Sequence, residues 1–181
     1  MLTAQPRRAW ANGRQPNTTG VVVDPSNPNR MLAGLTFGVM VSTDAGLNWR
    51  WVCEDVLGGS SAVDAQVAIT GAGTLLVANP NGLFESSDDG CAWTKVGAIA
   101  APLQTTWLAL HPTDANRWLI AANDPNQAGG LIYQTTDAGA HFDPMPQPQA
   151  RLYLYSVAFA PSQPTRIYAA GSNNAGSNSA Y

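Results

Sequence analysis

Short apolar runs separated by turn residues recur along the chain, and this pattern predicts strands rather than helices. The first pair is Val-Val-Val at 21–23 and Met-Leu-Ala-Gly at 31–34, joined by a Pro-containing turn that ends in Arg30. Runs of this length, bounded by Pro, Asn and Asp, are typical of β-hairpins. The 17 Gly and 13 Pro among 181 residues also disfavour long helices. We therefore expect an all-β protein.

The same hairpin returns at 108–121 and at 157–171, each time as an apolar run, a Pro-containing turn, an Arg and a second apolar run. The second unit keeps the two strands, but its turn shrinks to residues 70–74, a change that surface loops tolerate. The arginines recur at one position of the hairpin. Recurrence at equivalent sites indicates a structural role in bracing the hairpin, and this role applies to Arg30, Arg117 and Arg166.

An eight-residue box follows each of the first three hairpins: a hydroxyl residue, any residue, Asp, any residue, Gly, two further residues and an aromatic. Its Asp residues lie 44 and 49 positions apart, a spacing typical of propeller blades. A short apolar run precedes each box, so each unit reads as four antiparallel strands, which is one blade. The box residues are Ser42, Asp44, Gly46 and Trp49; Ser86, Asp88, Gly90 and Trp93; and Thr135, Asp137, Gly139 and Phe142.

These boxes divide the chain into an N-terminal arm (1–17), three complete blades (18–61, 62–104 and 105–151) and a partial blade (152–181). The partial unit has two predicted strands and no box, so we expect about three and a half blades. Propellers close with 4 to 8 blades. The alternatives are the N-terminal part of a longer ring, which we favour, two copies that share one ring, and a small four-blade ring.

The three boxes resemble the Asp-box (BNR) repeat of sialidases, sortilin-like receptors, xyloglucanase-type glycosidases and photosystem assembly factors. The resemblance covers residues 18–181 and implies that each box is the turn between the third and fourth strands of a blade. Physical chemistry agrees, because a short Asp side chain accepts from backbone N–H groups in a tight turn. Gly supplies a conformation that a Cβ would penalise. We therefore interpret the box aspartates as structural and not catalytic.

The sequence offers no convincing catalytic pair. A sialidase needs a Tyr nucleophile, a Glu partner and converging arginines, and the two Glu here, Glu54 and Glu85, have no evident Tyr partner. In xyloglucanase-type enzymes the catalytic Asp lies between the second and third strands, where this chain has Phe37. The pair of carboxylates that glycoside hydrolysis requires is therefore missing. Asp124 is a lone loop acid, which we interpret as part of a turn.

Composition excludes several other classes. The net charge is −3 without a basic stripe, so we expect no nucleic-acid partner. No run of about 18 apolar residues predicts a membrane span. His111 and His141 do not form a metal motif, and no nucleotide motif is present, so we expect neither metal nor cofactor.

The two cysteines leave the redox state open. Cys53 follows the first box and Cys91 lies inside the second, on neighbouring blades, so a disulfide and two free thiols are both compatible with the sequence. The stretch Trp-Arg-Trp-Val-Cys-Glu-Asp, followed one blade later by Asp-Asp-Gly-Cys-Ala-Trp, resembles secreted bacterial Asp-box propellers of unassigned function. This resemblance implies an exported protein, although the first twenty residues contain no signal-peptide core.

We therefore predict a non-catalytic binding or scaffold module. Its loops would gather at one mouth of the propeller, where a rigid frame commonly presents binding residues, to meet a protein or glycan partner. The alternatives are a glycosidase fragment whose catalytic residues lie outside this chain, and a structural subunit that associates through an open blade edge. The predicted loops are Gly58–Val63, Asn79–Asn81, Asp124–Gly130 and Ser172–Ser179.

Overall fold

The computed structural model describes residues 15–59, 63–97, 103–124, 129–146 and 152–173, together with the backbone of 178–180. Within these residues the fold is built from strands, with a single 3-10 turn, η1 (Glu54–Leu57). The all-β prediction is confirmed. The strands are β1 (Thr18–Val23), β2 (Met31–Leu35), β3 (Gly38–Ser42), β4 (Arg50–Cys53), β5 (Gln66–Ile69), β6 (Leu75–Asn79), β7 (Gly82–Ser86), β8 (Thr94–Lys95), β9 (Gln104–Leu110), β10 (Trp118–Asn123), β11 (Gly130–Thr135), β12 (Asp143–Pro144), β13 (Leu152–Ala160), β14 (Gln163–Asn173) and β15 (Asn178–Ala180).

The strands form four antiparallel sheets in chain order. The first three sheets are β1-β2-β3-β4, β5-β6-β7-β8 and β9-β10-β11-β12, as the sequence predicts. The fourth sheet is β13-β14-β15. Here the expectation of only two strands was wrong, because β15 pairs with β14. The Asn- and Ser-rich sequence of β15 has no apolar alternation, and its pairing rests on backbone hydrogen bonds that a side-chain pattern does not report.

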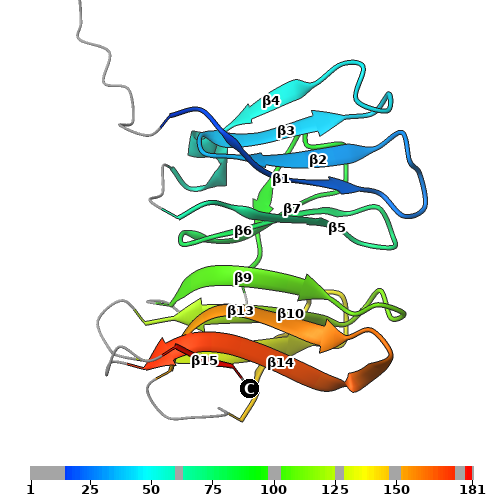
Figure 1. Cartoon of the computed structure of the whole chain (residues 1–181). Helices are drawn as coiled ribbons and strands as arrows, with labels where there is room; N and C mark the ends of the chain where they lie inside the picture. Colours follow the sequence, from blue (N-terminus) through cyan, green and yellow to red (C-terminus); the bar gives the residue numbers. More distant parts are fainter. Residues whose placement is uncertain are drawn as a thin grey trace, which may run out of the picture.

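The four sheets are stacked face to face, with three apolar cores between them (Figure 1). Alternation along the central strands explains this arrangement, because successive side chains of a strand point to opposite faces. On β6, Leu75 and Val77 pack toward the first sheet, whereas Leu76 and Ala78 pack toward the third. All four are buried. Both faces of an interior sheet are therefore buried against the neighbouring sheets.

The stack has two distinct ends. At the box end, on the right of Figure 1, lie the hairpin loop of each sheet and the turn after the third strand of each of the first three sheets. At the connector end, on the left, lie the β2–β3 and β6–β7 turns and η1, which leads from the first sheet toward the second. The described residues of the four predicted binding loops lie at the connector end, and residues 60–62, 125–128 and 174–177 lie outside the described residues. The prediction of a loop over Ser172–Ser179 was wrong at both ends, because β14 extends to Asn173 and β15 begins at Asn178.

Candidate functional site

The three boxes form matching turns at the box end, which we call the box turns (residues 42–49, 86–93 and 135–142). In the first, the Ser42 hydroxyl donates to Asp44 Oδ1 at 2.9 Å and accepts from the Gly46 N–H at 2.9 Å. Asp44 Oδ1 also accepts from the Asn48 N–H at 2.8 Å. The second and third turns repeat these bonds. Each carboxylate is therefore engaged inside its own turn.

Two successive residues of every box turn adopt the left-handed conformation. The first is not glycine: Ala45, Asp89 and Ala138 have φ of 59°, 58° and 57°. The second is always glycine, with φ of 84°, 78° and 92°. Side chains are penalised in this region, and the network around the hydroxyl and the carboxylate holds the first residue there. The closing tryptophans add a bond from each indole N–H to the glycine carbonyl, at 2.9 Å and 3.0 Å.

The hydrogen bonds also determine the charge of the box aspartates. Bonds from the His141 backbone and ring, followed by the Thr135 hydroxyl, lower the pKa of Asp137 to about 2. Bonds from Asn48 lower the pKa of Asp44, and the Ala92 N–H with the Ser86 hydroxyl lowers that of Asp88. A carboxylate of lowered pKa is ionised at neutral pH and is a poor proton donor. The box aspartates are thus suited to accepting turn hydrogen bonds.

Arg30 connects the first two sheets at the box end. Its Nη1 donates to Asp24 Oδ2 at 2.9 Å within its own hairpin, and its Nε donates to Asp89 Oδ1 of the next box turn at 2.8 Å. Burial works to raise the pKa of Asp24, but bonds from Ser26 and Asn27 and the Arg30 charge outweigh it, and the pKa is lowered. Arg50 adds two bonds to the same box turn, to the carbonyls of Asp89 and Gly90. The bracing role predicted for Arg30 therefore extends to a neighbouring sheet.

The other recurring hairpin residues differ in their contacts. The Arg117 guanidinium lies 5.8 Å from the centre of the Phe159 ring on the following sheet. His111 takes the place of Asp24, and its Nδ1 accepts from the N–H of Asp114 at 3.0 Å. This bond requires the proton on Nε2. His111 therefore accepts a hydrogen bond within its own hairpin turn, as Asp24 does in the first hairpin.

The Cys53–Cys91 disulfide that the sequence left open is absent, and both thiols are free. Cys53 ends β4 opposite Gly38, at the connector end. Cys91 lies in a box turn, which meets the first sheet at Arg50. Cys53 lies three positions along β4 from Arg50, roughly 10 Å of extended chain. A disulfide requires Cα atoms within about 7 Å.

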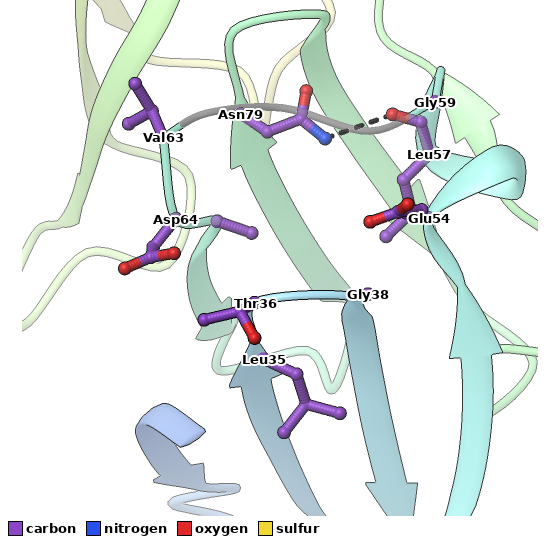
Figure 2. A pocket seen from close by; sticks show the side chains of 10 residues that line it. Leu35, Thr36, Gly38, Glu54, Leu57, Gly59, Val63, Asp64 and Asn79 are labelled. Carbon is purple, nitrogen blue, oxygen red and sulfur yellow. Dashed lines mark hydrogen bonds between the residues drawn. The ribbon is translucent and has the colours of Figure 1, made fainter. Parts of the chain in front are cut away.

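A small hollow lies at the connector end between the first two sheets (Figure 2). Glu54 of η1 and Asp64, just before β5, lie on opposite sides of it, and Asn79 Nδ2 donates to the Leu57 carbonyl at 3.0 Å. Asp64 belongs to no repeated element, so its position opposite Glu54 could not be predicted from the sequence. The cavity volume is about 20 Å³, enough for roughly one water molecule. A sugar ring does not fit inside it.

A larger groove runs across the inner strands near the connector end, and we call it the aromatic groove. Its volume of about 370 Å³ is within the range of ligand sites. Tyr153 and Tyr155 present tilted rings whose centroids are 5.6 Å apart, and the Tyr155 hydroxyl is 2.8 Å from that of Ser172. Three different sheets contribute residues, so no local motif could predict the groove. Its residues are Val63, Asp64, Gln66, Thr106, Trp107, Tyr153, Leu154 and Tyr155.

The remaining candidate residues stay apart from this groove. Phe37 lies in the β2–β3 turn, where its ring is 5.9 Å from that of Trp51 and its carbonyl accepts from the indole N–H. Glu85 lies on β7 opposite Thr94. The backbone of Asp124 closes its loop by donating to the Gly129 carbonyl at 3.2 Å. The structure thus brings none of these predicted positions together as a catalytic group.

Two further findings concern the described residues only. They contain no group of three or more His, Cys, Asp or Glu that could hold a metal ion. They also contain no helix with the length and apolar character needed to cross a membrane.

Comparison with solved structures shows a β-propeller fold. The chain matches the GH74 enzyme of Niastella koreensis with a TM-score of 0.66 at 16% identity, over 95% of this chain and 32% of that one. It matches the GH74 xyloglucanase of Xanthomonas campestris with a TM-score of 0.62 at 16% identity, over 87% and 28%. The match to YCF48 bound to D1 peptide has a TM-score of 0.60 at 14% identity, over 93% and 51%. No protein-family model and no curated protein matches the sequence.

The class that the fold and the comparisons define is therefore a partial β-propeller, whose described residues form three four-stranded sheets and one three-stranded antiparallel sheet. The chain spans about a third of the GH74 enzymes and about half of YCF48.

Proposed function

We propose that this chain is a non-catalytic binding module that holds an extended segment of a partner protein in the aromatic groove. The observation that carries the proposal is the groove itself, in which aromatic side chains and a few polar groups from three sheets converge. Aromatic-lined grooves with a small number of polar groups suit extended peptides, because rings contribute large contact area and polar groups set the register.

The chemistry of the connector end supports binding over catalysis. Glu54 and Asp64 are the two acids that face one hollow, yet the hollow is too small for a sugar ring. Phe37, where a xyloglucanase-type acid would stand, is occupied in packing on Trp51. The box aspartates bond within their own turns. Among the described residues, the aromatic groove is the candidate site that combines room for a ligand with several aromatic side chains.

The solved neighbours supply one further argument for each kind of ligand. YCF48 has been seen with a bound peptide, which supports a peptide in this chain. The Xanthomonas campestris neighbour is a xyloglucanase by name, and exposed aromatic rings also stack on sugars, so a glycan is the second candidate.

Displayed random linear peptides and an array of β-glucans and sialosides provide the probes. We expect peptides to be enriched on the wild-type chain and to lose at least about tenfold in affinity on Tyr155→Ala, which is about 1.4 kcal/mol. Val56→Ala is the matched control, since Val56 is exposed at the connector end and does not line the groove. If no peptide is enriched and the chain binds a glycan that Tyr155→Ala no longer binds, the ligand of the groove is a glycan and not a peptide. Binding that both variants retain would rule out the groove.

A further inference from the structure

The four sheets repeat one packing register, which defines a face toward the preceding sheet and a face toward the following one. In each of the first three sheets, the second residue of the second strand points toward the following sheet. Three such residues are completely buried, at 0% exposure, because a following sheet covers them. They are Leu32, Leu76 and Leu119.

The fourth sheet has the same register but no described sheet beyond it. Tyr168 stands two residues after Arg166, as Leu32 stands two after Arg30, and it is 49% exposed. Two positions later, Ala170 is a small residue, like Gly34, Ala78 and Ala121 at the same position of the first three sheets. The outer face of the fourth sheet therefore has the pattern of an inter-sheet face without its cover.

The first sheet has an exposed apolar row on the face opposite to the one that packs on the second sheet. Val21, Ala33, Met40 and Trp51 lie in one cross-strand row over all four strands. In the second sheet the matching row places Val67, Val77 and Phe84 in the core against the preceding sheet. In the first sheet, Val21 and Trp51 are each 54% exposed.

We propose that a second copy of this chain covers these faces, with the Tyr168 face of one copy packed on the Val21–Trp51 row of the next. The contact continues the inter-sheet packing that the chain already repeats three times. It joins different surfaces of the two copies, so it is a heterologous contact. Two copies supply eight sheets, which is within the range of closed propellers.

The arginine contact of the first interface extends to this contact. Arg166 holds the sequence position of Arg30 and is exposed. In the new contact it faces the first box turn, where Ala45 stands at the position of Asp89. No carboxylate is offered there, so Arg166 bonds to backbone carbonyls of the turn, as Arg50 does to those of Asp89 and Gly90.

Light scattering after size exclusion, with sedimentation velocity over a range of concentrations, measures the association of the 181-residue chain. We expect a species of about twice the 19.0 kDa chain mass. Tyr168→Glu should reduce association at least about tenfold, because it places a charge in an apolar interface. Val21→Glu should have the same effect from the opposite face. Val56→Glu is the control, since Val56 is 51% exposed in η1 at the connector end and belongs to neither face.

A mixing experiment tests the direction of the contact. Tyr168→Glu and Val21→Glu chains each retain one intact face, so an equimolar mixture should form a one-to-one dimer that neither variant forms alone. Circular dichroism establishes that each variant remains folded. A wild-type chain that stays monomeric across a 100-fold range of concentration would overturn the proposal. So would a dimer that persists in both variants, or variants that fail to complement each other.

Discussion

Arg30 and Asp89 lie on adjacent sheets and are joined by a contact of 2.7 Å and a hydrogen bond of 2.8 Å. The same guanidinium bonds to Asp24, whose side chain is buried. One arginine therefore neutralises a buried carboxylate and connects two sheets. The Arg30–Asp24 and Arg30–Asp89 contacts should contribute differently to the free energy of unfolding. A buried acid that loses its partner is costly, whereas an exposed one is not.

Arg30→Ala should destabilise the fold by about 1–3 kcal/mol, since it leaves Oδ2 of the buried Asp24 carboxylate without its charged partner. Asp89→Ala should cost only about 0.2–1 kcal/mol, because the Asp89 side chain is half exposed. Urea unfolding of both variants measures the difference. Equal losses would show that the inter-sheet contact, and not the buried acid, carries the stabilisation.

Gly46→Ala and Gly139→Ala place the same methyl group at the same position of two box turns. Both residues have positive φ, so each substitution should cost about 1–2 kcal/mol. At Gly46 the nearest atoms to a new Cβ are 3.6 Å away, whereas at Gly139 the Trp118 ring is 2.6 Å away. We expect Gly139→Ala to cost at least about 1 kcal/mol more. Thermal unfolding compares the two, and equal melting temperatures would mean that Trp118 moves aside freely.

The His141–Asp137 pair predicts a pH dependence. Bonds to Asp137 raise the pKa of His141, and those from His141 help to lower the pKa of Asp137 to about 2. The histidine contribution is complete below its unfolded pKa of about 6.5 and is lost as pH rises through the raised value. The aspartate contribution is present above about pH 4 and is lost as pH falls toward 2. The pair therefore stabilises the turn most between about pH 4 and 6.5.

His141→Asn is the matched variant, because Asn48 occupies this position in the first box turn and donates its side-chain amide to Asp44. The variant should keep the bond to Asp137 but lose the decline in stability between pH 6 and 8. Melting temperatures across this range test the expectation. An unchanged decline would assign the pH dependence to another group.

Asn123 binds the backbone of the following sheet through both atoms of its amide. Nδ2 donates to the Leu154 carbonyl and Oδ1 accepts from the Leu154 N–H, each at 2.8 Å. Asn123→Ala should cost about 2 kcal/mol, because it leaves buried backbone groups unpaired. Asn81→Ala is the comparison, since Asn81 makes one side-chain bond to a backbone carbonyl from a half-buried position and should cost less. A loss at Asn123 no larger than that at Asn81 would contradict this interpretation.

The sequence predicted those features whose causes are local. Hairpins follow from apolar runs around Pro-containing turns, and four strands per unit follow from their repetition. The residues that close each box turn lie within eight positions of one another, so their spacing reports the geometry. The central strands could be recognised because their alternation serves two cores.

Contacts between distant segments could not be predicted in this way. Arg30 and Asp89 are 59 positions apart, and the Asn123–Leu154 bonds join different sheets. The aromatic groove combines β5, β9 and β13, whose residues share no motif. β15 forms through backbone pairing with little apolar content. Each of these depends on how the sheets are placed against one another, which a linear pattern does not specify.

The alternation on β6 limits how such a protein can evolve. Leu75 serves one core and its neighbour Leu76 the other, so gain or loss of a single residue inside the strand would reverse both faces at once. Length changes are tolerated in turns, where no core depends on the alternation of side chains, and the shortened turn at residues 70–74 is one such case. Units of this kind can therefore vary in length at their ends, whereas the middle strands of an interior sheet must keep their alternation because it serves two cores.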